Sequence, residues 1–144
     1  MQRTVTTTLL LLCWLLLPPI VWGQEDNELL MPTETWSSNE HKVGDTPLIL
    51  YDSGGADGNA LASKTGKILF TPEQAGKCIE IEIQELALDN QDELYILEGA
   101  APFSNWSSPN EKLIIRKFTK EDRPTLPLKL RSSDKSGKLT IGSK

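Results

Sequence analysis

Hydrophobic and polar residues alternate most clearly in the segment from Gly76 to Gly99. Three isoleucines in this segment are separated by two glutamates, in the order Ile79, Glu80, Ile81, Glu82 and Ile83. This period of two is typical of a strand with one buried face. A second apolar run at residues 94–97 follows the polar stretch LALDNQDE. The segment therefore predicts two strands joined by an acidic loop, with the isoleucines turned toward a core.

Shorter apolar runs predict the remaining strands. They lie at residues 48–51, 67–71, 113–118, 128–130 and 139–141. The run at 113–118 fits either a strand or one helical turn, because it is too short for its period to decide. Gly, Pro, Asn and Ser separate these runs at short intervals, and none of them extends into a long amphipathic helix. The pattern predicts an all-β fold, an antiparallel β-sandwich or jelly roll.

The first 23 residues have the pattern of a signal peptide. Arg3 precedes an apolar run at residues 9–17, and Gly23 marks a suitable cleavage point. The run is short for a transmembrane helix, although a permanent N-terminal anchor is the alternative reading. We expect a mature chain without a transmembrane helix, which is secreted or lies at the cell surface or in the periplasm after cleavage near Gly23.

The rest of the chain divides into an arm and a domain. Residues 24–47 are polar and have little periodicity, which predicts a loose N-terminal arm with one short strand near residues 34–37. Residues 48–144 are expected to form one β-sandwich domain. The single histidine, His41, has no catalytic motif beside it and is interpreted as a solvated loop residue.

Charge and cysteine content restrict the partners. The chain has 15 Lys and Arg against 20 Asp and Glu, and removal of residues 1–23 takes away only Arg3, which leaves 14 against 20 and a net charge of −6. Nucleic acid is excluded as a partner, because phosphate binding requires a basic face. After cleavage only Cys78 remains. It is either a half-buried residue of the second sheet face or a free thiol that pairs between chains.

A glycine-rich loop at residues 52–59 carries two candidate binding residues, Asp52 and Asp57. With Asn59 these carboxylates offer oxygen ligands for calcium, and the glycines permit a phosphate-binding turn. The loop lacks the spacing of a phosphate loop and of an EF-hand, which favours a structural turn.

A second loop, residues 100–110, carries the aromatic residues Phe103 and Trp106. They form either a stacking pair for a sugar or peptide, or an aromatic cover over one end of the core. Large apolar side chains seldom stay exposed without a role, which favours the cover.

A resemblance to CUB domains lies in the block FTPEQAGKCIEIEIQELALDNQDELYILEGA. The shared pattern is an alternating strand, then Leu86-x-Leu88-Asp89, then Asp92-x-Leu94-x-Ile96 before an acid and Gly99. The stretches LILYDSGGADGN and TPEQAGK resemble the disulfide-poor CUB-like domains of exported Bacteroidetes-type bacterial proteins. The resemblance covers approximately residues 48–141.

The resemblance implies a jelly-roll β-sandwich that binds a partner without catalysing a reaction. Many CUB domains hold Ca²⁺ at one end, and two acids of that site match Asp89 and Asp92. The family's third acid has no counterpart, its usual cysteines are absent and its final strand is missing. These departures indicate either a sandwich that closes differently or a truncated form of a longer product.

Two function classes follow from these observations. The first is a secreted or surface binding and adhesion module for an extracellular protein or carbohydrate, acting through loops at one end. The alternative is a secreted hydrolase inhibitor, with a projecting loop such as residues 100–110, or an accessory fragment of a larger exported enzyme. We do not expect an enzyme, because the mature chain has one histidine, one cysteine and no H-E-x-x-H motif. Asp89 and Asp92 also share one short loop, whereas glycosidase carboxylates flank the bond they cleave.

Overall fold

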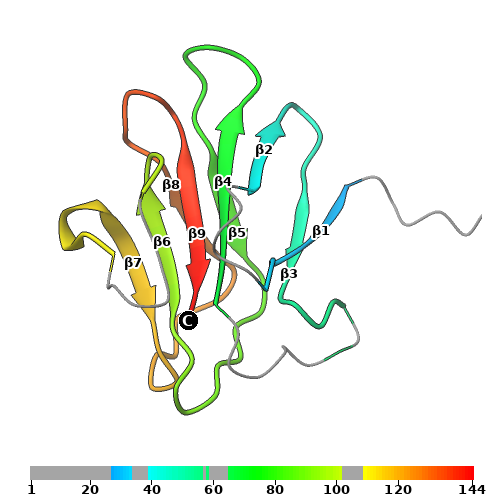
Figure 1. Ribbon diagram of the computed structural model, residues 1–144, viewed down its shortest axis with the longest axis vertical. Coiled ribbons are helices and arrows are strands. Elements are labelled where there is room, and N and C mark those ends of the chain that lie inside the picture. Colours follow the sequence, from blue (N-terminus) through cyan, green and yellow to red (C-terminus); the bar gives the residue numbers. More distant parts are fainter. Residues whose placement is uncertain (1–26, 34–38, 57, 59–64, 102–108) are drawn as a thin grey trace, which may run out of the picture.

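The computed structural model describes residues 27–33, 39–56, 58, 65–101 and 109–144. Within them the fold is nearly all β, with one short 3₁₀ turn, η1 (Glu111–Leu113) (Figure 1). The strands are β1 (Glu28–Leu30), β2 (Asn39–Val43), β3 (Ile49–Tyr51), β4 (Gly66–Pro72), β5 (Glu80–Ile83), β6 (Leu94–Glu98), β7 (Ile114–Phe118), β8 (Leu128–Arg131) and β9 (Leu139–Ser143).

The described strands form one five-stranded sheet and two two-stranded sheets. The large sheet has the order β2-β4-β9-β6-β7, and the small sheets are β1-β3 and β5-β8. Strand β9 lies in the middle of the large sheet and pairs antiparallel with β4 and β6. Residues 139–142 of this strand are all buried, so the last strand of the chain is the centre of the fold.

The expected burial of the central isoleucines is confirmed. Ile79 is 5% exposed, while Ile81 and Ile83 are half-buried and pack against the same cluster. Glu80 and Glu82 point to solvent, as the alternation predicted. The cluster also contains Ile68, Phe70, Ile96, Phe118, Leu139 and Ile141 from the large sheet. The β5-β8 sheet and the five-stranded sheet therefore share one core, an arrangement compatible with a β-sandwich.

Strand β6 is buried on both faces. Leu94 and Ile96 face the shared core. Tyr95 and Leu97 belong to a second, smaller cluster with Ala101. The near-continuous apolar sequence of β6 follows from this double coverage, because neither face of the strand meets water.

The expectation of a purely antiparallel arrangement is wrong for two pairs of strands. Strand β1 pairs parallel with β3, and β2 pairs parallel with β4. Parallel neighbours need a long connection that returns the chain to the same end of the sheet. The connections over residues 31–48 and 44–65 are long enough to do this.

The segment predicted as a loose arm contributes two strands, β1 and β2. The strand expected near residues 34–37 falls outside the described residues. His41 is not a solvated loop residue: it lies half-buried in β2, with its ring centroid 6.4 Å from that of Phe70. Strand β2 is at the edge of the sheet and carries polar side chains, among them Glu40, which accepts a 2.6 Å hydrogen bond from the Thr71 hydroxyl. An edge strand of this kind has no apolar pattern to reveal it.

The ambiguous run at residues 113–118 combines both of its predicted forms. Asn110 caps the short turn η1, because its side chain accepts a hydrogen bond from the backbone N–H of Lys112. Strand β7 then begins at Ile114 and ends at the fully buried Phe118. The strand thus brings the chain to the end of the sheet where the next loop begins.

Candidate functional site

Two loops lie side by side at one end of the molecule. One connects β5 to β6 through residues 84–93, and the other connects β7 to β8 through residues 119–127 (Figure 1, bottom). The Lys120 ammonium donates a hydrogen bond to the Asn90 side-chain carbonyl and so joins them. A shallow cavity of about 300 Å³ lies between the loops. It is lined by Leu86, Ala87, Leu88, Thr119, Asp122 and Arg123.

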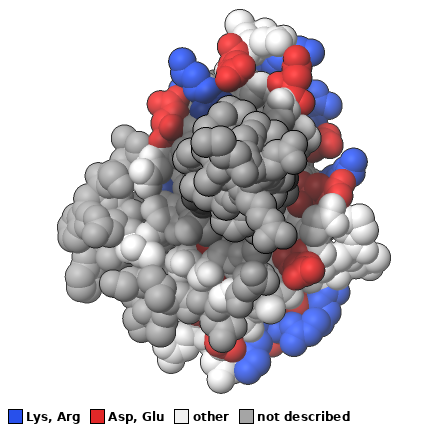
Figure 2. All heavy atoms as spheres, turned by 90° about the vertical axis from the view of Figure 1, so that its right-hand side faces the viewer, with Lys and Arg blue, Asp and Glu red and all other residues white. Residues whose placement is uncertain are grey.

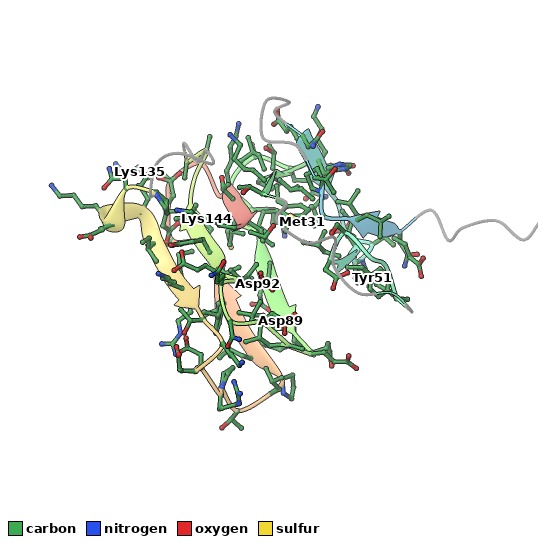
Figure 3. The ribbon with its side chains drawn as sticks, turned by 60° about the horizontal axis from the view of Figure 1, so that its bottom comes forward. Met31, Tyr51, Asp89, Asp92, Lys135 and Lys144 are labelled. Atoms are coloured by element: carbon green, nitrogen blue, oxygen red, sulfur yellow. The ribbon has the colours of Figure 1, made fainter. Side chains whose placement is uncertain are left out.

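Asp89 and Asp92 form one exposed turn of the first loop (Figure 3). The Asp92 carboxylate accepts a 3.1 Å hydrogen bond from the backbone N–H of Asp89. The Asp92 N–H in turn donates to the Asp89 carbonyl at 3.2 Å. Asp92 therefore stabilises its own turn, whereas the Asp89 carboxylate has no hydrogen bond or ion pair with any residue that the structure describes.

Glu93 fixes the downstream end of this loop. Its backbone exchanges two hydrogen bonds with Lys144, of 2.8 and 2.9 Å. Its carboxylate lies 2.6 Å from the Lys117 ammonium and also accepts a hydrogen bond from the Tyr95 hydroxyl. The hydrogen bonds from Lys117 and Tyr95 lower the pKa of Glu93, and burial of the phenol is the main reason why the pKa of Tyr95 is raised. The loop is thus attached to three separate strands, β6, β7 and the end of β9.

The second loop is held by its own polar turn. The Asp122 carboxylate accepts hydrogen bonds from the Thr119 N–H at 2.7 Å and from the Thr119 hydroxyl at 2.9 Å. These bonds lower the pKa of Asp122. One guanidinium nitrogen of Arg123, Nη1, donates to the carbonyls of Asp122 and Lys120. Both loops therefore present polar groups in fixed positions.

The acidic turn fits Ca²⁺ in ligand type but supplies only part of a coordination shell. Calcium binds six to eight oxygen ligands, many of them carboxylates. Asp89 and Asp92 provide two carboxylates, and the turn adds backbone carbonyls. In the ranges that the structure describes, no group of three or more His, Cys, Asp or Glu residues is gathered as a metal site. A bound calcium ion would need water or a further ligand to complete its shell.

Asp52 lies in a turn of its own sequence. Its carboxylate accepts a 2.8 Å hydrogen bond from the Gly54 N–H, and its carbonyl accepts one of 3.2 Å from the Gly55 N–H. Gly55 has a φ of 79°, a conformation that favours glycine. The other predicted binding residues, Asp57, Phe103 and Trp106, lie outside the described residues. The structure therefore places Asp52 and the Asp89–Asp92 pair in separate turns.

The most extensively hydrogen-bonded carboxylate of the described residues was not predicted from the sequence. Glu98, at the end of β6, accepts hydrogen bonds from the turn that follows β8. The donors are the Ser132 hydroxyl, the Ser133 N–H and hydroxyl, and the Asp134 N–H. The partners are distant in sequence, so no local motif reveals them. This group joins β6 to the β8–β9 turn.

Cys78 is half-buried at the start of the β5 segment. Its sulfur accepts a 2.7 Å hydrogen bond from Nε of Arg131, a residue of β8. This hydrogen bond is the main reason why the pKa of Arg131 is raised. A contact between two chains through Cys78 stays a prediction.

Charges of both signs lie close together on the described part of one face. Figure 2 shows acidic and basic side chains interspersed along the described part of the face it presents. In the described strands and turns no helix has the length and apolar character needed to cross a bilayer. Comparison of the chain with protein-family models found no match, and comparisons with curated proteins and with solved structures found none either.

Proposed function

We propose that the chain is a non-catalytic, exported binding module with a CUB-like jelly-roll β-sandwich. Its binding surface is the loop end formed by residues 84–93 and 119–127. The observation that carries this proposal is the side-by-side placement of two polar loops, joined by Lys120 and Asn90 and attached to strands through Glu93. Loops fixed on a rigid β scaffold are the usual place for recognition.

The partner in this proposal is an extracellular protein or carbohydrate. The loop end offers hydrogen-bond donors and acceptors and charges of both signs. Among these residues are Asp89, Asn90, Lys120 and Arg123. The cavity between the loops is shallow and borders apolar as well as polar groups. A surface of this kind suits a partner that lies across it more than a small substrate enclosed in a cleft.

We further propose that Ca²⁺ binds at Asp89 and Asp92. The support is the exposed Asp89 carboxylate, which lacks a partner within the described chain and lies next to a second carboxylate. Two carboxylates in one turn repel each other, and a bound cation would remove this repulsion. Calcium would supply a fixed positive charge that holds the loop in one conformation.

Calcium is expected to raise the melting temperature of the mature chain. A ligand at one hundred times its dissociation constant stabilises the folded state by about 2.7 kcal/mol. Asp89→Asn is expected to remove this response without lowering the melting temperature in chelator, because the Asp89 side chain makes no hydrogen bond in the described structure and its neutralisation also removes the repulsion with Asp92. The measurement is a melting curve in calcium and in chelator for each variant.

The matched control for this test is Glu85→Gln, which removes an exposed acid from the same loop. It should keep the calcium response of the unchanged chain. Equal melting temperatures in calcium and in chelator for the unchanged chain, or a full response in Asp89→Asn, would remove calcium from the proposal.

A further inference from the structure

The backbone of residues 84–88 has no hydrogen-bond partner among the residues that the structure describes. Strand β5 ends at Ile83, and none of the backbone N–H or C=O groups from Gln84 to Leu88 bonds to another residue in the part of the chain that the structure describes. Backbone polar groups in a folded protein are nearly always paired, with protein or with water. The segment is therefore an unpaired edge, directly beside the proposed binding surface.

The side chains of the same segment alternate as in a strand. Leu86 and Leu88 are half-buried and pack against the shared core. Glu85, Ala87 and Asp89 are exposed. Two hydrophobic anchors thus hold the segment in place while its backbone stays free to pair.

Two features of the sequence explain why the β5-β8 pairing stops before this segment. The last pair is Ile83 with Leu128, and the same register would place Pro124 opposite Ala87. Proline has no N–H to donate to a sheet. In addition, Gln84 and Glu85 are both exposed, which breaks the alternation by one residue in the manner of a bulge.

The separation of the two segments opens the shallow cavity of about 300 Å³. Residues 86–88 form one wall, and Thr119, Asp122 and Arg123 form the other. The unpaired backbone therefore borders open space of the size of a few side chains. A partner can approach it without displacing any residue that the structure describes.

The second wall carries a positive charge: Arg123 forms no close ion pair with a described acid, although its charge helps to lower the pKa of Asp122. Arg123 donates through Nη1 to two backbone carbonyls, and this leaves the N–H groups of Nη2 and Nε available. One oxygen of the nearby Asp122 carboxylate, Oδ2, accepts both hydrogen bonds from Thr119. A carboxylate on the partner would complement Arg123 in charge and geometry.

We propose that residues 84–88 accept an extended peptide as an added β-strand, with an acidic side chain of that peptide bound by Arg123. An extended peptide presents N–H and C=O groups at the strand repeat, which a sugar does not, and strand addition is a general mode of peptide recognition. This inference rests on the proposed binding function and names the chemical class of the partner.

The test uses three peptides, each with an acetylated N-terminus and an amidated C-terminus. The first is Thr-Val-Glu-Val-Thr, the second has the same sequence with alternate amide nitrogens methylated, and the third has Lys in place of Glu. Binding to the mature chain is followed by amide NMR shifts and by hydrogen exchange. The first peptide is expected to slow exchange at residues 84–88. The second and third peptides are expected to bind at least about tenfold more weakly than the first. The second loses hydrogen bonds, and the third loses a charge pair.

Two variants connect this binding to the named groups. Ala87→Pro removes a backbone N–H that the folded chain does not use, so it should prevent binding. Arg123→Gln should abolish the preference for the Glu peptide over the Lys peptide. Lys129→Gln, a change in the exposed face of β8, serves as the control and should bind like the unchanged chain.

Equal binding by the methylated and unmethylated peptides would overturn the proposal, as would slow exchange at residues 84–88 in the free protein. Failure of all three peptides to bind at millimolar concentration would also overturn it. The calcium response of Asp89 does not depend on peptide binding. If that response is found and the peptides fail, strand addition is wrong while the binding surface stands.

Discussion

Ile96→Ala is expected to lower the free energy of unfolding by about 2–5 kcal/mol. Ile96 is 1% exposed and lies in β6, next to the central strand of the large sheet. Its side chain belongs to the core that the large sheet shares with β5 and β8. Truncation removes buried methylene groups and leaves a cavity that the surrounding strands cannot fill.

Ile49→Ala is the matched control, because it changes the same residue type at a position that is 41% exposed. The free energy of unfolding should fall by less than about 1 kcal/mol in this variant, since much of the Ile49 side chain is already exposed to water. Urea unfolding of both variants gives the comparison. Similar losses at the two positions would mean that the shared core is not organised as described.

Glu98→Ala is expected to lower the free energy of unfolding by about 2–4 kcal/mol. The carboxylate accepts hydrogen bonds from Ser132, Ser133 and Asp134, and Ser132 is only 4% exposed. Removing the carboxylate loses several hydrogen bonds to a charged acceptor at once, which returns the exposed Ser133 and Asp134 N–H groups to water and leaves the Ser132 hydroxyl with the Lys138 carbonyl, 2.7 Å away. Glu82→Ala is the control, because Glu82 forms exposed contacts, an ion pair with Lys129 at 3.2 Å and a hydrogen bond accepted from the Gln84 side chain, and its loss should change stability by less than about 1 kcal/mol.

The same carboxylate makes stability depend on pH in a defined direction. Partial burial raises the pKa of Glu98, but the hydrogen bonds from Ser133, Ser132 and Asp134 outweigh burial and leave the pKa below its ordinary value. A lowered pKa in the folded state means that the stabilisation is complete above the unfolded-state pKa of about 4.3 and is lost as the pH falls through the folded-state value. Glu98→Gln should therefore lose less stability than the unchanged chain between neutral pH and pH 3. The measurement is the free energy of unfolding of both proteins as a function of pH. An equal loss in the two proteins between neutral pH and pH 3 would contradict this prediction.

The sequence predicted the parts of the fold that hydrophobic alternation determines. Residues 79–83 and 67–71 lie where apolar side chains recur, and in both of them burial follows the alternation. The last strand also lies where the apolar residues predicted it, but Thr140 and Gly142 between them are buried as well, because this strand is the centre of the sheet. Strand β2 was missed because Asn39–Val43 pairs on one side only and has polar residues, among them the half-buried His41, where an apolar alternation would mark a strand. The parallel pairings were missed for a different reason: strand direction depends on long connections, and periodicity carries no information about them.

The position of the acidic loop between two strands was predicted, but its hydrogen bonds were not. The loop with Asp89 and Asp92 lies at one end of the sheet, as the alternation on either side of it implied. The sequence did not indicate that the Asp92 carboxylate would cap its own turn. It also gave no sign of the unpaired backbone at residues 84–88, because that feature depends on which residues of the β8 segment face it.

The central claim that a single measurement can test is that Ca²⁺ binds in the loop of residues 84–93, at the proposed binding surface. The most direct measurement is an amide NMR titration of the mature chain with calcium, followed residue by residue. The account predicts shifts concentrated at residues 88–93, a smaller effect at Lys120 through its contact with Asn90, and unchanged amides in β1 and β3. Absence of any shift at millimolar calcium, or shifts spread over the sheets away from this end, would contradict it.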